Sequence, residues 1–231
     1  MTVYSSRIAE RIGPGATTAP KRMAARASVM PALTAVRVSG HPDFDRVAID
    51  VDGALPGFDV SYVPQIAMDE SGEPVAVRGR AFLDVSIVPA GTFADEDPDA
   101  FPLPEIDDLA ALRGIAHTGD WEGVVSLGIG VAARLPFLVR RLTAPPRIVI
   151  DIAHGLPGAG HHQLRRGERG AAVATWQWRL RQALSRDVAV DEDFGPHTET
   201  ATRDFQRSHG LTANGVVGRR SRAAMEHALG L

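Results

Sequence analysis

The stretch from Leu164 to Met225 constrains the fold more than any other part of the chain. It contains two similar turn sequences, DEDFG at 191–195 and NGVVG at 214–218, and a helical pattern follows each of them. Before the first turn, Val173, Trp176 and Leu180 fall on one face of a helix that we expect over 171–184, at about 100° per residue. The stretch therefore predicts a small module of three helices.

Turn chemistry supports the boundaries of this module. Gly167 and Gly170 permit the turn that enters the first helix, Pro196 suits the first turn of the second helix, and Gly210 ends that helix as a C-terminal cap. We expect Ser221 to cap the third helix. The predicted core also contains Gln177, Leu184, Val190, Phe194, Ala201, Phe205, Leu211, Val216, Ala224, Met225 and Leu229.

The region from Thr34 to Ala153 alternates like half-buried β-structure. In RVAIDVD from Arg46, for example, Val47, Ile49 and Val51 share one face. Gly/Pro/Asp clusters at GALPGFD and SGEPVAVRG predict turns, and several short strands with such punctuation favour an antiparallel β-sandwich. Further strands are predicted at TAVRV from 34, AFLDVSIV from 81, GVVSLGIG from 123, FLVRRL from 137 and RIVIDI from 147. The fold class is therefore α+β and multidomain: an antiparallel sandwich followed by a three-helix module.

Two segments flank the sandwich. Residues 1–33 are rich in Ala, Ser, Thr, Pro and Arg, which predicts an extended or disordered arm that is ordered only when something else holds it. Residues 154–163 (HGLPGAGHHQ) are typical of a linker, so the helical module takes 164–231. An acidic, proline-containing segment from Phe93 predicts a surface excursion, and its IDDLAAL end could form one or two helical turns.

The composition of the chain excludes some kinds of site and gives no support to several classes of function. The 231 residues include no cysteine, which removes disulfides and zinc–thiolate sites, and the net charge of −3 gives no reason to expect nucleic-acid binding. No apolar run reaches the length of a membrane span, and the N-terminus has no apolar core of a secretory signal.

The helical stretch resembles the small peptidoglycan-binding domain that is appended to many bacterial cell-wall hydrolases. The resemblance rests on V173-x-x-W176-Q177-x-x-L180, VDEDFG-x-x-T198, F205-Q206, G210-L211 and N214-G215-x-V217-G218. Three positions depart from the family pattern: Glu192 replaces a glycine, Asn214 an aspartate and Arg219 a proline. These departures alter the edges of the groove that the resemblance implies.

The sandwich region resembles the AMIN-like domain of actinobacterial envelope proteins. The matching segments are HPDFDRVAIDVDGALPGFDVSYV, GDWEGVVSLGIGVAARLPFLV and LTAPPRIVIDI, and together they span about 34–153. The resemblance implies a β-sandwich that helps to localise cell-wall amidases and envelope machinery, and it carries over no catalytic residue.

Peptidoglycan is the partner that the first resemblance implies, and seven side chains are candidates to contact it. Trp178 lies off the core face of its helix, so it either faces solvent and stacks on a sugar ring or packs against the sandwich or linker. Arginines could bond the carboxylates of stem peptides, or simply form a solvated face. The full candidate set is Trp178, Arg179, Arg181, Asp193, Thr198, Arg203 and Gln206.

No residue pattern predicts a catalytic site, a metal site or a cofactor. His154, His161 and His162 lie in a Gly/Pro segment without an acidic second shell, so flexible linker histidines are expected. Asp95, Asp97 and Asp99 begin like a calcium loop, but Ala100 and Ile106 stand where Gly and Glu are required. The Asp107–Asp108 pair has no context that would raise a pKa, and Trp121 is expected in the core or a turn of the sandwich.

Two functions are compatible with these observations. The first is a non-catalytic protein of the cell envelope or cell wall that binds peptidoglycan, in which the sandwich binds a second envelope component. The alternative is a structural component of a phage tail or contractile injection particle, assembled in the cytoplasm, whose arm over 1–33 docks on a larger protein assembly. An amidase or muramidase is a weaker third hypothesis, because the chain shows no site for either reaction.

Overall fold

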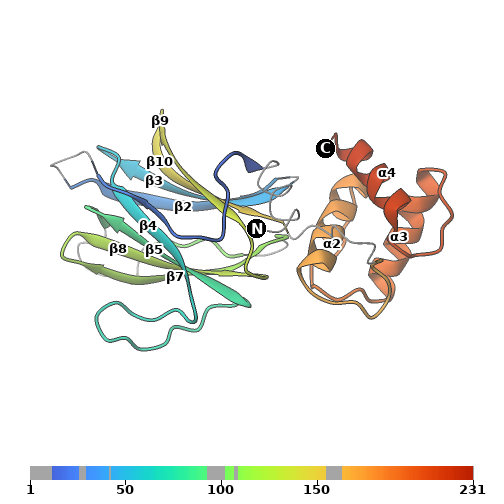
Figure 1. The fold of residues 1–231 in the computed structure, drawn as a ribbon, viewed down its shortest axis with the longest axis horizontal. Helices are drawn as coiled ribbons and strands as arrows, with labels where there is room; N and C mark the ends of the chain where they lie inside the picture. Colours follow the sequence, from blue (N-terminus) through green and yellow to red (C-terminus); the bar gives the residue numbers. More distant parts are fainter. Residues whose placement is uncertain are drawn as a thin grey trace.

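The computed structural model describes residues 12–25, 30–41, 43–92, 102–106, 109–154 and 163–230. Two layers of β-sheet form the larger part, and three helices form a separate module beside one end of it (Figure 1). Among the described residues, no helix is both long and apolar enough to cross a membrane.

Each layer of the sandwich contains five strands. One sheet has the order β1-β4-β5-β8-β7 and the other has the order β6-β2-β3-β10-β9. All pairings are antiparallel except the short parallel contact between β2 and β6. The strands are β1 (Lys21–Met23), β2 (Ala32–Gly40), β3 (Phe44–Asp52), β4 (Gly57–Val63), β5 (Ala81–Val88), β6 (Gly91–Thr92), β7 (Leu112–Trp121), β8 (Val124–Val131), β9 (Phe137–Thr143) and β10 (Pro146–Ala153).

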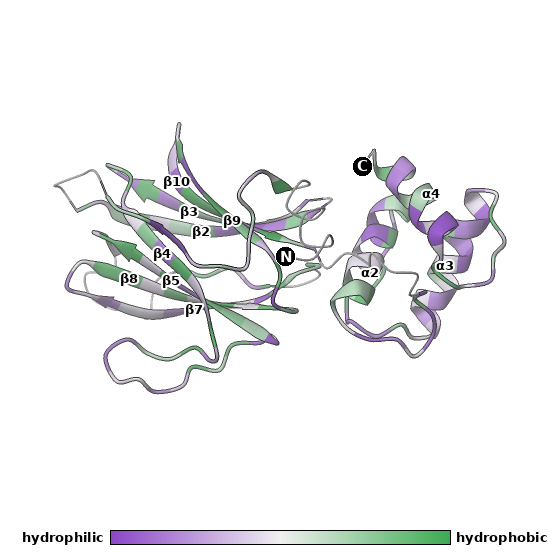
Figure 2. Cartoon of the chain, viewed as in Figure 1, coloured by the Kyte–Doolittle hydropathy of each residue, from purple (hydrophilic) through white to green (hydrophobic). Residues whose placement is uncertain are grey.

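The sandwich core lies between the two layers, whose strands contain both hydrophobic and hydrophilic residues (Figure 2). The predicted alternation is confirmed on β3, whose Val47, Ile49 and Val51 are all buried. Tyr62 joins the core at its edge: its hydroxyl donates to the Leu135 carbonyl at 2.6 Å, and burial raises its pKa to about 12.

The structure differs from the sequence-based expectation at several strands. The GALPGFD cluster is not only a turn, because β4 begins at Gly57, and β7 was not predicted at all. Leu112 starts β7, so residues 109–112 do not form the helical turn expected at the end of IDDLAAL. A segment such as β7 forms a strand because it pairs with a neighbouring strand, although its own sequence does not alternate regularly.

The described part of the arm lies against the sandwich. Lys21–Met23 pairs with Val60–Phe58 of β4, and the side chain of Ile12 is buried against Leu138 and Ala153. Within the described residues, the sandwich of the same chain therefore holds this part of the arm. Residues 1–11 lie outside the described part of the chain.

The helical module contains α2 (Ala171–Leu184), α3 (Pro196–Ser208) and α4 (Arg219–Leu229). The predicted bounds of α2 are confirmed, and Pro196 occupies the first turn of α3 as expected. Positive φ angles at Gly167, Gly170 and Gly210 confirm the turns assigned to these residues. The module has a core of its own, built from Leu164, Val173, Trp176, Leu180, Val188, Phe194, Ala201, Phe205, Val217 and Met225.

Three details of this module were predicted wrongly. Ser221 lies inside α4 and does not cap it, because Gly218 holds the cap position. Val217 is fully buried where Val216 was expected, and Val188 is more buried than Val190. For the two valines, a residue one or two positions away points into the core instead of the predicted one.

Candidate functional site

A buried glutamine fixes each of the two turns that the sequence repeats. Gln177 on α2 donates from Nε2 to Asp191 Oδ1, to the Asp193 carbonyl and to Thr198 Oγ1 at 2.6–2.9 Å. Its Oε1 accepts the backbone N–H groups of Asp191 and Glu192, both at 3.1 Å. One side chain therefore satisfies much of the polar backbone of the 191–195 turn.

Gln206 on α3 does the same for the second turn. Its Nε2 donates to the Val216 carbonyl at 2.9 Å and to Ser221 Oγ at 3.0 Å, while its Oε1 accepts the Gly215 N–H at 2.9 Å. Each glutamine follows a buried aromatic residue, Trp176 or Phe205, and these two rings meet edge to face at 5.8 Å. The repeat in the sequence is thus a repeat of aromatic–glutamine pairs, each of which holds one turn.

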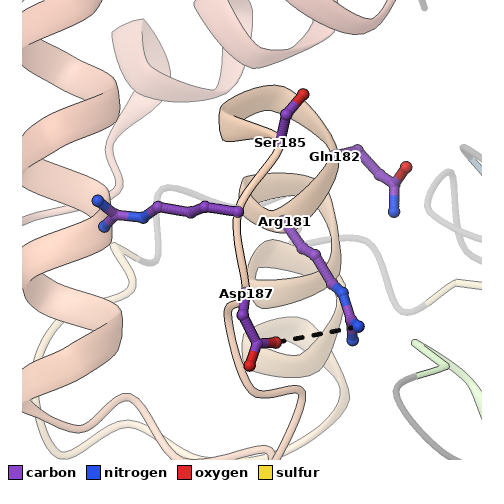
Figure 3. Close-up of a pocket in the computed structure, with 5 residues that line it drawn as sticks. Arg181, Gln182, Ser185 and Asp187 are labelled. Atoms are coloured by element: carbon purple, nitrogen blue, oxygen red, sulfur yellow. Dashed lines mark ion pairs between the residues drawn. The ribbon is translucent and has the colours of Figure 1, made fainter.

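A polar hollow of about 500 Å³ lies at the C-terminal end of α2 (Figure 3). Arg181 and Asp187 reach toward each other across it, with a nitrogen–oxygen distance of 3.9 Å. Arg186 bonds Asp204 of α3 at 2.8 Å, and the hydrogen bonds from Arg186 and Arg207 lower the pKa of Asp204. The hollow is lined by Arg181, Gln182, Ser185, Arg186 and Asp187, and of these only Arg181 was a sequence-based candidate.

The same face of α2, nearer the N-terminus of the helix, is docked onto the sandwich, because Arg181, Gln182 and Ser185 follow Trp178 by three, four and seven residues. Trp178 is 6% exposed, and its ring meets His154 edge to face at 5.1 Å. A Cβ on Gly40 would lie only 3.0 Å from Trp178 Nε1, so this side chain packs directly on the end of β2. The prediction that Trp178 faces solvent is wrong, and the alternative, packing against the sandwich, is confirmed.

Two sets of ion pairs flank this tryptophan. Arg179 is 3% exposed and bonds Asp43 at 3.2 Å, so the expected surface position of Arg179 is also wrong. Glu192 bonds Arg113 at 2.8 Å and Arg80 at 3.0 Å. These arginines lie at or beside the starts of β7 and β5, so charges from both domains hold the contact together.

Glu192 shows what its departure from the family pattern does. Its φ of 65° is in the left-handed region that glycine adopts freely and other residues adopt at a cost. The turn is kept by Gln177, and the side chain that glycine would lack reaches both sandwich arginines. Glutamate at this position therefore makes the turn conformation less favourable than glycine would, but it adds ion pairs between the two domains.

His154 lies beneath this contact and is not a flexible linker residue. It is 1% exposed, and its Nε2 lies 2.8 Å from Oδ1 of the fully buried Asp45. Oδ2 of Asp45 accepts the backbone N–H groups of Ala111 and Leu112 at 2.6 and 2.9 Å. The expectation for His154 failed because the Gly/Pro composition starts only after it; His161 and His162 lie outside the described residues.

The other candidates divide into core and surface positions. Thr198 and Gln206 are buried within the hydrogen-bond networks of the two turns. Asp193 pairs with Arg169 at 3.0 Å and Arg203 with Glu199 at 2.8 Å, both on the surface. Among the seven candidates, Arg181, Asp193 and Arg203 are the ones that keep a surface side chain, and they do not share one hollow. Trp121 is the last residue of β7, directly before the turn at 122–123, and it is 63% exposed, so it does not lie in the core. Asp95, Asp97, Asp99, Asp107 and Asp108 lie outside the described residues.

The contact between the domains yields a first prediction. Trp178→Ala is expected to separate the two domains, because the ring fills the space between His154 and Gly40 and its loss leaves the flanking ion pairs accessible to water. The radius of gyration from small-angle X-ray scattering should rise by several ångströms. Trp121→Ala is the matched control, and it should leave the scattering profile unchanged. Identical profiles for both variants would contradict the role of Trp178.

The geometry defines a two-part protein: an antiparallel β-sandwich that carries a docked three-helix module with two glutamine-held turns. The chain belongs to the AMIN-like domain family, whose model matches residues 31–154, more than half of the chain. Residues 169–225 match the family described as "Putative peptidoglycan binding domain". The order of the two modules and the sandwich-then-helices fold are as the sequence predicted.

Similar solved structures cover parts of the chain. The SleB N-terminal domain is 29% identical and aligns over 31% of this chain and 99% of its own, with a TM-score of 0.30. A peptidoglycan-binding protein from Clostridioides difficile, in complex with glutamine hydroxamate, is 21% identical over 49% of this chain and 67% of its own (TM-score 0.30). A periplasmic domain of the EpsAB fusion protein of the Vibrio vulnificus type II secretion system is 21% identical over 51% and 56% (TM-score 0.29). No curated protein matches the sequence.

Proposed function

We propose that this protein binds the bacterial cell wall without catalysing a reaction on it, with peptidoglycan held by the helical module. The match of residues 169–225 to the peptidoglycan-binding family is the observation that carries the proposal. The core of the module and both glutamine-held turns are complete, so nothing in its departures from the family pattern disturbs the fold.

The hollow at the end of α2 is the part of the module that we assign to the ligand. The interface with the sandwich includes Trp178 and Arg179 of α2, which are buried, and the hollow lies beyond them at the C-terminal end of the helix. Arg181, Gln182 and Arg186 line the hollow, and guanidinium groups form strong charge-assisted bonds with carboxylates. Stem peptides carry such carboxylates, so the hollow suits a stem peptide better than a bare glycan strand.

The sandwich moves with the helical module in this proposal. Glu192, Arg179 and Trp178 attach the two domains to each other, so wall binding by the helices places the sandwich in a fixed orientation at the wall. The protein then acts as an adaptor in the cell envelope. Neither family match is to a catalytic domain, and release of muropeptides by the purified protein would overturn the non-catalytic part of the proposal.

The particle alternative depended on an arm that only a larger assembly would order. Residues 12–25 instead contact β4 and Leu138 of the same chain. No described contact therefore favours a particle over a wall-bound adaptor.

A variant of the hollow tests the assignment of the site. Arg186→Gln combined with Arg181→Gln is expected to weaken binding to purified peptidoglycan by about tenfold, because two charge-assisted bonds are lost at a partly exposed site. Co-sedimentation across a range of protein concentrations measures the change. Arg219→Gln combined with Arg220→Gln, on the exposed start of α4, is the matched control with the same change of charge. Equal binding by both double variants would remove the hollow from the site.

A further inference from the structure

The hairpin between β7 and β8 carries the most exposed large hydrophobic side chain among the described residues. Trp121 is 63% exposed and ends β7, whose second residue, Arg113, bonds the helical module. The ring therefore lies at the end of the sandwich that is farther from the helices. Trp176 and Trp178, the other two tryptophans of the chain, are buried, so Trp121 is the one that a partner molecule can reach.

The backbone of this hairpin is strained beside the exposed ring. Glu122 has a φ of 50° and Gly123 a φ of 78°, and such positive angles at both turn residues are typical of type I′ hairpins. Glycine adopts them freely, whereas glutamate does so at a cost. The other two non-glycine residues with positive φ in the described ranges are Ser185, which lines the hollow, and Glu192, which bonds the sandwich arginines. Strain of this kind is concentrated at sites of contact, and Glu122 fits that pattern.

Two carboxylates lie next to Trp121 along the sheet. Glu122 follows it directly. Asp69 lies over Gly119, because a Cβ on that glycine would be 2.9 Å from the Asp69 Cβ. Gly119 and Trp121 are two residues apart on the outer face of β7, which separates them by about 7 Å. Among the described residues, no lysine or arginine bonds either carboxylate.

The basic residues of this sheet and of the segment that crosses it are bonded to other groups or point elsewhere. The pairs are Arg22 with Asp59, Arg80 and Arg113 with Glu192, and Arg78 with the Ile106 carbonyl. Lys21 points toward the arm, where its Nζ lies 4.0 Å from the position of a Cβ on Gly15. Within the described ranges, five carboxylates of this region therefore lack a cationic partner: Asp69, Glu70, Glu73, Asp84 and Glu122.

Repulsion between these acids is evident at Asp84, on the same outer face. The pKa of Asp84 is raised, because burial disfavours its charge and because Asp69 and Asp59 repel it. Ser126, the cross-strand neighbour of Gly119 on this face, is fully buried, and its Oγ has no hydrogen-bond partner. Asp69 is exposed over Gly119, so a cation that draws its side chain outward also gives a donor access to this hydroxyl. The face thus lacks N–H donors and positive charge together.

We propose that Trp121, Asp69 and Glu122 bind lysine or arginine side chains of an extended, basic segment of a partner protein. The face of an exposed tryptophan ring attracts such cations, and the carboxylates form charge-assisted hydrogen bonds with them. In an extended segment, every second side chain points the same way at a spacing of about 7 Å. That spacing matches the separation of Trp121 from Gly119, over which Asp69 lies.

A side chain is the form of cation that this arrangement fits. Among the described residues, no three acidic or histidine side chains are placed to hold one metal ion. Cations on separate flexible side chains, by contrast, need only one carboxylate each. This inference goes beyond wall binding and does not depend on it.

Fluorescence anisotropy with the full-length protein tests the proposal. The probe is a labelled eight-residue peptide in which arginine and serine alternate, at low salt. We expect it to bind, and we expect a peptide with neutral citrulline in place of arginine to bind more weakly by about tenfold or more. The unlabelled arginine peptide should also change the tryptophan emission of the protein, because Trp121 is exposed and the other two tryptophans are buried.

Protein variants locate the site. Trp121→Ala should weaken binding of the arginine peptide by about fivefold, and Trp121→Phe should weaken it less because a ring remains. Asp69→Asn combined with Glu122→Gln should weaken it by about tenfold. Asp52→Asn combined with Glu105→Gln is the matched control: it removes two charges from exposed positions outside this sheet, and it should bind like the wild type.

Four outcomes would overturn the proposal. They are absence of binding, equal binding of the arginine and citrulline peptides, wild-type affinity of Trp121→Ala, and equal weakening by the two double variants. The last of these would indicate a general attraction to the acidic sandwich rather than a site at the hairpin. Equal affinity for free choline and for the peptide would also overturn it, in favour of a site for a small amine.

Discussion

Replacing Asp45 with alanine is expected to lower the free energy of unfolding of the sandwich by about 3–5 kcal/mol, because several buried polar groups lose their partner at about 1–3 kcal/mol each. The carboxylate is fully buried and accepts the Ala111 and Leu112 backbone N–H groups at one oxygen and faces His154 at the other. Alanine leaves these three groups without a partner in the interior, where unmade hydrogen bonds are costly. A fall in melting temperature of about 10–20 °C follows for a domain of this size.

Asp52→Ala is the matched control for this prediction. Asp52 lies on the same strand, β3, but it is exposed at the far end, so its loss should change stability by less than about 0.5 kcal/mol. Thermal and urea unfolding of both variants provide the comparison. If the free energy of unfolding of Asp45→Ala is within about 1 kcal/mol of the wild-type value, Asp45 does not anchor this end of the sandwich.

The second large effect is expected at Gln177. Gln177→Ala should destabilise the helical module by about 3 kcal/mol, because it removes five hydrogen bonds and leaves part-buried backbone groups of the 191–193 turn unsatisfied. The sandwich has a separate core, so it should keep its own unfolding transition. Loss of the module should also abolish retention on peptidoglycan.

Gln182→Ala controls for the change of side chain, because Gln182 lies on the same helix and is exposed. Far-UV circular dichroism reports the helices, and it should show the early transition only for Gln177→Ala. Coincident melting of the two variants would mean that the turn does not depend on its glutamine.

Local patterns in the sequence predicted most of the fold. The spacing of Val173, Trp176 and Leu180 predicted the bounds of α2, and the alternation along 46–52 predicted which face of β3 is buried. Both patterns arise because each element buries one face in the core of its own domain. Strand β7 has no such regular pattern, since glycine and polar residues interrupt it, and only its pairing with β8 makes it a strand.

The contact between the domains could not be predicted in the same way. Trp178 and Arg179 lie off the core face of α2, so their positions on the helix indicate solvent, and only the sandwich buries them. His154 is next to a Gly/Pro stretch, and its burial depends on Asp45, which is 109 residues away. Glu192 was the one position whose sequence could have indicated the contact between the domains. It stands where the family has glycine, and in the structure it bonds two arginines of the sandwich.

Retention of the full-length protein on purified peptidoglycan is the most direct measurement of the central claim. We expect the intact chain to co-sediment at low salt, and we expect a chain that lacks residues 164–231 to stay in the supernatant while its sandwich, which has its own core, remains folded. Failure of the intact chain to sediment, or equal sedimentation of the shortened chain, would contradict the assignment of wall binding to the helical module.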